Sequence, residues 1–200
     1  MDFDIISGGV KKAFDTFVQN IVAYIVGLLI AFIGSILIVT IAPLFYSLYC
    51  MVLKGTRGEN VEIKDIFYGF SSGSIFVRSW IGFIVYGLLI SIISILLNLV
   101  AIVVPSLALL ISLISMLVSL IISIFLFYTI FIYVMTPSES IIYALKESFG
   151  IGKSNIVMVF LTIIISGILS ILVVTAPLGM LFSAYVLKGL KPEIKDDSGI

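Results

Sequence analysis

Charged residues divide the chain into polar segments and long uncharged stretches. Three stretches contain no Asp, Glu, Lys or Arg: Thr16 to Leu53, Ser79 to Ser138, and Ser154 to Leu187. They are 38, 60 and 34 residues long, whereas one membrane-spanning helix needs about 20 apolar residues. The pattern therefore predicts an all-α integral membrane protein whose uncharged stretches cross a bilayer.

All 11 basic residues fall into four groups that flank these stretches. The groups are Lys11 and Lys12; Lys54, Arg57, Lys64 and Arg78; Lys146 and Lys153; and Lys188, Lys191 and Lys195. Because Lys and Arg in short loops stay on the cytoplasmic side, we place every group inside, and each stretch then crosses an even number of times. This favours six transmembrane helices as three hairpins, with both termini cytoplasmic in the cell membrane.

The lengths of the stretches leave an alternative open. The middle stretch has room for two full spans, and Pro105-Ser106 at its centre suits a turn. The outer stretches give only about 51 to 57 Å of helix, barely two bilayer thicknesses, so these hairpins are short, thin the bilayer, or do not fully cross. The alternative is four transmembrane helices, in which Val18 to Ile41 and Ile156 to Thr175 are single spans.

An amphipathic segment precedes each uncharged stretch. Apolar residues recur with helical spacing in all three segments, which are Val10, Ala13, Phe14 and Phe17; Ile63, Ile66, Phe67 and Phe70; and Ile141, Ala144, Leu145 and Phe149. Such segments commonly lie as short helices in the membrane interface. We therefore expect a short interfacial helix before each hairpin.

The ends of the first and third stretches also match in sequence. Val39-Thr40-Ile41-Ala42-Pro43 corresponds to Val174-Thr175-Ala176-Pro177, and Leu-Lys-Gly follows each proline at the same distance, at Leu53-Lys54-Gly55 and Leu187-Lys188-Gly189. We interpret residues 1–200 as a single membrane domain built from three pseudo-repeats, at about 10–54, 63–137 and 141–188, with residues 189–200 as a polar tail. Repeats are frequent in transporters but do not by themselves select a function.

Several short motifs resemble a known group of proteins. They are Thr136-Pro137-Ser138-Glu139-Ser140, Ala144-Leu145-Lys146-Glu147-Ser148, Lys153-Ser154-Asn155, Lys54-Gly55-Thr56-Arg57-Gly58-Glu59 and Asp65-Ile66-Phe67-Tyr68-Gly69-Phe70. With these motifs the chain resembles prokaryotic multipass membrane families of unknown function related to the membrane domain of glycerophosphodiester phosphodiesterases. The resemblance implies a membrane module, and it carries over no catalytic residue because the soluble catalytic domain of those enzymes is missing.

Small polar residues follow one face of each half of the middle hairpin. Gly87, Ser91, Ser94 and Asn98 share a face of the first half, and Ser112, Ser115, Ser119 and Ser123 share a face of the second. With the turn centred on Pro105, the two faces lie opposite each other in the hairpin. Small residues let transmembrane helices approach closely, so we expect these two faces to pack together. The main interpretation is a packing seam, and the alternative is a polar groove for a ligand.

Three prolines are candidate hinges: Pro43, Pro105 and Pro177. Prolines of this kind break the helices that line transporter sites, although they also occur as ordinary features of helical hairpins. Trp80, next to Arg78, is expected to be an interface anchor.

Composition narrows the possible functions. Histidine is absent, cysteine occurs once, and 11 basic residues balance 11 acidic ones. We therefore expect no enzyme activity, no metal, no cofactor and no nucleic-acid partner. The favoured hypothesis is a non-enzymatic membrane module that organises lipids or partner proteins, with a membrane-protein partner or a homo-oligomer possible; the alternative is a transporter or channel for lipids or small neutral solutes.

Overall fold

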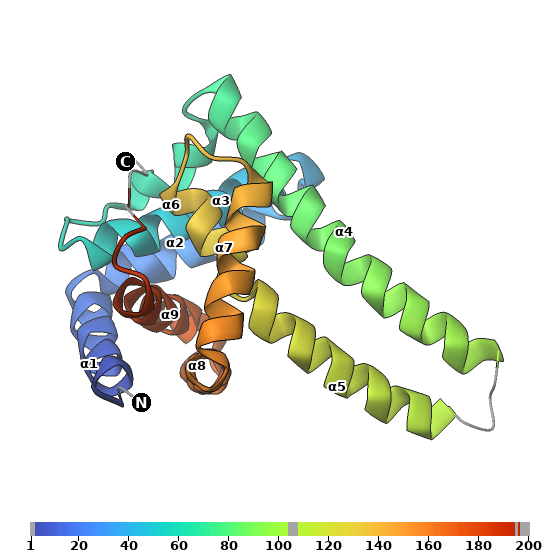
Figure 1. Cartoon of the computed structure of the whole chain (residues 1–200). Helices are drawn as coiled ribbons and strands as arrows, with labels where there is room; N and C mark the ends of the chain where they lie inside the picture. Colours follow the sequence, from blue (N-terminus) through green and yellow to red (C-terminus); the bar gives the residue numbers. More distant parts are fainter. Residues whose placement is uncertain (1–2, 104–107, 195, 197–200) are drawn as a thin grey trace.

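The computed structural model describes residues 3–103, 108–194 and 196. All regular secondary structure in these ranges is helical (Figure 1). The expectation of an all-α chain is therefore confirmed for the described residues.

In chain order, the helices are grouped by the three predicted units. The first unit contains α1 (Phe3–Gln19), α2 (Ile21–Gly34) and α3 (Ile38–Thr56). The second contains η1 (Ile63–Phe70), α4 (Gly73–Val103), α5 (Ala108–Leu126) and α6 (Thr129–Met135). The third contains α7 (Ile141–Ser154), α8 (Ile156–Leu169), η3 (Val173–Thr175) and α9 (Ala176–Leu190).

The two outer units share a bend that the sequence patterns did not predict. An asparagine separates an amphipathic helix from an apolar one in each unit, and the chain turns by 83° at Asn20 and by 104° at Asn155. At the first bend the Asn20 side chain donates to the Thr16 carbonyl and accepts from the Val61 amide, both at 3.1 Å. The bend therefore sends α2 away from α1 and ties the junction to the segment before η1.

Within the described ranges, four helical segments are long and apolar enough to cross a membrane. They are Ile38–Thr56, Gly73–Ile92, Leu109–Met135 and Val173–Leu190, and the number rises to six if each bent pair counts as one span. These helices indicate a membrane-spanning protein. The structure is compatible with either of the two predicted crossing numbers, so six crossings remains an expectation.

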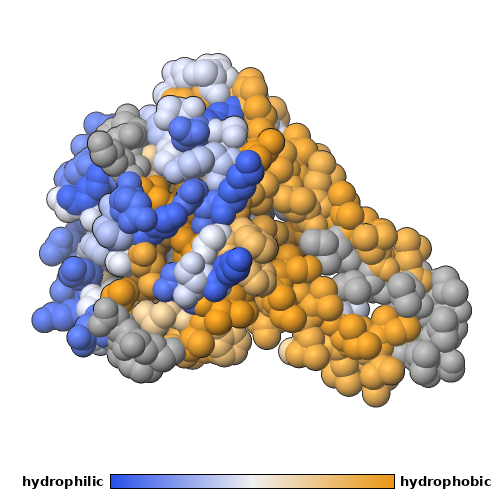
Figure 2. All heavy atoms as spheres, in the orientation of Figure 1, coloured by the Kyte–Doolittle hydropathy of each residue, from blue (hydrophilic) through white to orange (hydrophobic). Residues whose placement is uncertain are grey.

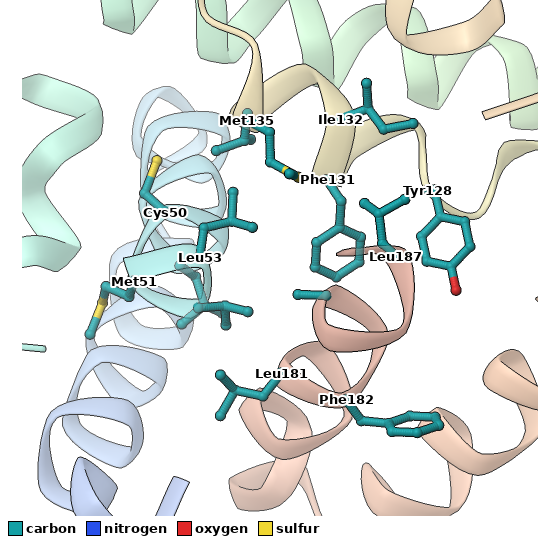
Figure 3. Close-up of a cluster of buried hydrophobic side chains, with 14 of the residues drawn as sticks. Cys50, Met51, Leu53, Tyr128, Phe131, Ile132, Met135, Leu181, Phe182 and Leu187 are labelled. Carbon is teal, nitrogen blue, oxygen red and sulfur yellow. The ribbon is translucent and has the colours of Figure 1, made fainter. Parts of the chain in front are cut away.

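The core forms around α3, α6 and α9 (Figure 3). Met51 and Leu53 of α3 and Leu181 and Leu187 of α9 are fully buried. Tyr128, which precedes α6, is buried with them. Leu53 and Leu187 are equivalent in the predicted repeat, so the same position of each outer unit supplies this core.

Glycines let other helices approach the core helices closely. A Cβ atom at Gly9 would lie 3.3 Å from a Val186 methyl, and one at Gly189 would lie 2.9 Å from Ile5. The hydroxyls of Thr16 and Tyr185 form a 2.7 Å hydrogen bond beside these contacts. As a result α1, at the start of the chain, packs along α9, near its end (Figure 1).

Helices α4 and α5 leave the bundle as a long antiparallel arm (Figure 1). Their apolar side chains remain exposed along the arm, including Ile95, Leu109 and Met116. Figure 2 shows this arm as almost entirely hydrophobic. Since so much exposed apolar surface is unfavourable in water, the arm is suited to a bilayer.

Candidate functional site

Ionisable side chains gather on the side of the molecule opposite the arm (Figure 2). We use the name charged base for those that join the ends of the helices through ion pairs. They are Lys54, Arg57, Glu59, Asp65, Glu147, Lys188, Lys191 and Asp196.

The ion pairs of the charged base connect all three units. The Lys54 ammonium lies 2.9 Å from the Asp65 carboxylate, which joins α3 to η1. Asp196 receives Arg57 at 2.9 Å and Lys188 at 3.1 Å, which joins the C-terminal segment to the ends of α3 and α9. Lys191 pairs with Glu147 of α7. Lys54 and Lys188, equivalent in the predicted repeat, thus each hold an aspartate that follows in the chain.

The ion pairs of the charged base shift the pKa values of several of its side chains. The hydrogen bond from Arg57 lowers the pKa of the Glu59 carboxyl below its ordinary value. Burial lowers the pKa of Arg57, but its hydrogen bonds and charge attraction with Glu59 and Asp196 together raise the pKa above its ordinary value. The hydrogen bond to Glu147 raises the pKa of Lys191. These shifts favour the charged forms, as expected of a structural ion-pair network.

The two outer hairpins end in exposed apolar turns, here called the first tip (residues 34–40) and the second tip (residues 168–175). In the first tip Ile36 is 80% exposed and Ile38 75% exposed. In the second tip Ile171 is 74% exposed and Leu172 64% exposed. Neither tip contains a charged residue. A turn in water would expose polar residues instead, so the tips have the character of lipid-facing surface.

Hydrogen bonds within each tip satisfy polar groups of the turn. In the first tip the Ser35 and Leu37 amides donate at 3.0 Å to the Ala31 and Gly34 carbonyls, and the Thr40 hydroxyl donates at 2.7 Å to the Leu37 carbonyl. In the second tip the equivalent Thr175 hydroxyl donates at 2.8 Å to the Leu172 carbonyl. The repeated Val-Thr motif thus has a structural role, because unsatisfied backbone groups are costly in hydrocarbon.

The predicted serine seam lies along the arm. Ser91 of α4 and Ser112, Ser119 and Ser123 of α5 are exposed, Ser115 is half-buried, and a Cβ atom at Gly87 would meet nothing within 4 Å. The Ser123 hydroxyl donates within its own helix to the Ser119 carbonyl at 2.8 Å. The side chains of Ser94 and Asn98 lie outside the described part of the chain. Both the seam and the alternative polar groove therefore stay predictions.

The three candidate hinges occupy different positions. Pro43 lies inside α3, where its carbonyl accepts the Ser47 hydroxyl at 2.8 Å. Pro177 lies in the first turn of α9, a position where proline fits a regular helix. Pro105 lies outside the described residues. Hinge motion at these positions remains a prediction.

Arg78 has a role that the sequence patterns missed. Its guanidinium donates to the Tyr133, Thr136 and Glu139 carbonyls at 2.6, 2.8 and 2.9 Å, where α6 ends. It also lies 3.9 Å above the centre of the Tyr133 ring, while the Tyr133 hydroxyl donates back to the Arg78 carbonyl at 3.0 Å. Backbone carbonyls leave no signal in a sequence, which is why this contact could not be anticipated.

Next to Arg78, helices α3, α4 and α6 enclose an aromatic cavity of about 200 Å³. Its aromatic lining residues are Phe45, Tyr46, Tyr49, Phe83, Tyr86 and Tyr133. The sequence did carry a signal for it, since aromatic residues occur at helical spacing in α3 (45 and 49) and α4 (83 and 86). The spacing does not identify a cavity, because nothing in the sequence shows that α3 and α4 pack together here.

Comparisons with protein-family models, with curated proteins and with solved structures find no match to this chain. The resemblance to membrane families related to glycerophosphodiester phosphodiesterases therefore remains a sequence-based expectation.

Proposed function

We propose that this protein is a non-enzymatic membrane module, inserted from the cytoplasmic side, that organises the lipids around it. The observation that carries the proposal is the contrast between the charged base and the two exposed apolar tips. Charged groups remain at the membrane surface, whereas apolar turns with internally bonded backbone groups are stable within hydrocarbon.

Helix lengths support this mode of insertion. Helices α2 and α8 each contain 14 residues, which corresponds to about 21 Å, whereas the hydrocarbon core is about 30 Å thick. Helix α4 contains 31 residues, or about 46 Å, and can cross the core completely. The returning segments Ile38–Thr56 and Val173–Leu190 are long enough to cross, but each is joined through its tip to one of the shorter helices α2 and α8, which limits the depth of the hairpin. We therefore propose that only the α4–α5 arm crosses, while the outer hairpins enter the bilayer and return to the cytoplasmic side.

The amphipathic helices fit the same arrangement. Phe14 and Val18 of α1 and Ile142 and Phe149 of α7 are exposed apolar residues, and the sharp bends at Asn20 and Asn155 allow α1 and α7 to lie along the surface while α2 and α8 enter the bilayer. Two surface helices and two partly inserted hairpins would displace lipid mainly from the cytoplasmic leaflet. A protein of this shape orders and sorts neighbouring lipids without needing a reaction centre.

Native mass spectrometry of the protein, released gently from its own membranes, tests the lipid-organising role. We expect a lipid of one class to be retained at a fixed stoichiometry, because an organising module binds specific lipids. The same measurement on protein delipidated with excess detergent and returned to the extracted lipids should restore the same class. A bare protein in both samples would refute the proposal.

A further inference from the structure

The aromatic cavity and Arg78 form one continuous structure. Ser79 lines the cavity immediately after Arg78, and the Tyr133 ring lines the cavity while lying under the guanidinium. The Tyr46 phenol, another lining group, also interacts with the guanidinium. Among the described residues, every side chain that lines the cavity is uncharged. An apolar cavity thus adjoins a single cation.

The guanidinium retains the capacity to bind an anion. Its described partners are three backbone carbonyls, the Tyr133 ring and the Tyr46 phenol, all uncharged, and within the described part of the chain no carboxylate lies within ion-pair distance of it. Its Nε atom is buried without a hydrogen-bond partner among the described residues. Carbonyls orient the guanidinium but do not neutralise its charge, so an anion nearby would be stabilised.

The position of Arg78 in the chain matches the position of a lipid phosphate. Arg78 is the last charged residue before the uncharged stretch that begins at Ser79. The cavity residues Gly82 and Tyr86 follow four and eight positions later in the same helix, which places them about 6 and 12 Å deeper along its axis. In a bilayer this is the offset between a phosphate at the interface and the acyl chain below it.

We infer that the aromatic cavity between α3, α4 and α6 binds an acyl chain of an anionic phospholipid whose phosphate contacts Arg78. This inference rests on the proposed lipid-organising function and specifies which lipids the protein retains. The chain provides the probe for testing it, because Trp80 is the only tryptophan in the sequence. Its ring contacts Phe83, a cavity-lining residue, with the ring centres 5.8 Å apart.

The experiment measures quenching of Trp80 fluorescence in vesicles by brominated acyl chains. Full-length protein is reconstituted in phosphatidylcholine with equal small fractions of brominated phosphatidylglycerol or brominated phosphatidylcholine. We expect the anionic lipid to occupy the site with about fivefold higher relative affinity, the contribution of one cation at the membrane surface. Soluble glycerol phosphate should not displace it, because the acyl chain holds the lipid in the cavity.

Five variants assign the effect to Arg78 and to the cavity. Arg78→Gln should abolish the preference for phosphatidylglycerol, while Arg78→Lys should keep most of it. Lys146→Gln removes an exposed cation of α7 away from the cavity and should change nothing. Ala42→Leu narrows the cavity and should reduce quenching by both lipids, whereas Ala176→Leu, at the start of α9, should not.

The outcomes separate this inference from the proposed function. Equal quenching by the two lipids in the unmodified protein, or a preference that persists in Arg78→Gln, would refute the role of Arg78. Quenching unchanged in Ala42→Leu would refute occupation of the cavity. Either result would leave the proposed insertion of the outer hairpins standing, because that insertion depends on the tips and not on this cavity.

Discussion

At the scale of single residues, glycines at equivalent positions set how closely the helices pack. Gly55 and Gly189 follow the equivalent lysines Lys54 and Lys188 at the ends of α3 and α9. A side chain at Gly55 would overlap the Tyr24 hydroxyl, and one at Gly189 would press on Ile5. The Leu-Lys-Gly motif therefore combines a core residue, an ion-pairing residue and a site of close helix approach.

Gly55→Ala should lower the free energy of unfolding by about 2 to 3 kcal/mol. The new methyl group would displace the Tyr24 hydroxyl, which donates at 3.3 Å to the Met51 carbonyl, and would overpack a fully formed contact. Gly150→Ala is the matched control, because its Cβ atom would meet nothing within 4 Å in the middle of α7. Thermal unfolding in one detergent should show a loss only for Gly55→Ala, and equal melting temperatures for both variants would contradict this packing.

Residue patterns also show where the sequence was informative and where it was not. The positions of Val10, Ile63 and Ile141 correctly indicated helical segments before each hairpin, because amphipathic spacing is a local property. The bends at Asn20 and Asn155 were not predicted, since asparagine favours helix ends and turns but does not set the angle between the two helices. The partners of Arg78 were missed because they are backbone carbonyls from a distant segment.

At the scale of elements, the outer hairpins are defined by their short first helices and apolar tips. The length of each uncharged stretch leaves open whether these hairpins cross fully. The structure adds the bends that separate α1 from α2 and α7 from α8. Because of these bends, the amphipathic residues of α1 and α7 are not part of the hairpins. The first helix of each hairpin, α2 or α8, therefore has only 14 residues.

Ile36→Lys, a charge placed at the first tip, should impair membrane integration. If the tip lies in hydrocarbon, the lysine costs about 2.5 to 3.5 kcal/mol, and the fraction of protein that resists alkaline carbonate extraction should fall. The control Ile142→Lys adds the same charge to an exposed position of α7, which we assign to the membrane surface, and should integrate normally. Normal integration of both variants would indicate that the first tip reaches water.

At the scale of the whole molecule, the ion pairs and the core hold three hairpins together at one end. Asp196 joins the ends of α3 and α9, Lys191 joins α9 to α7, and α1 packs along α9. The sequence correctly predicted the all-helical character of the described residues, and the division into three units stays a prediction. It could not predict that the N-terminal helix packs on the C-terminal one, because such contacts depend on tertiary packing. The serine positions along the arm likewise await a test of their own.

The measurement that tests the account most directly is the accessibility of single cysteines in intact cells. Cys50, which is fully buried, is first replaced by alanine, and one cysteine is then introduced at Ile36, Leu109 or Ile171. We predict that an impermeant maleimide added outside labels Leu109→Cys, near the end of the crossing arm. Ile36→Cys and Ile171→Cys should resist labelling both in intact cells and in inverted vesicles, because their tips lie in hydrocarbon. Labelling of both tip cysteines from outside would contradict the account and establish three fully crossing hairpins.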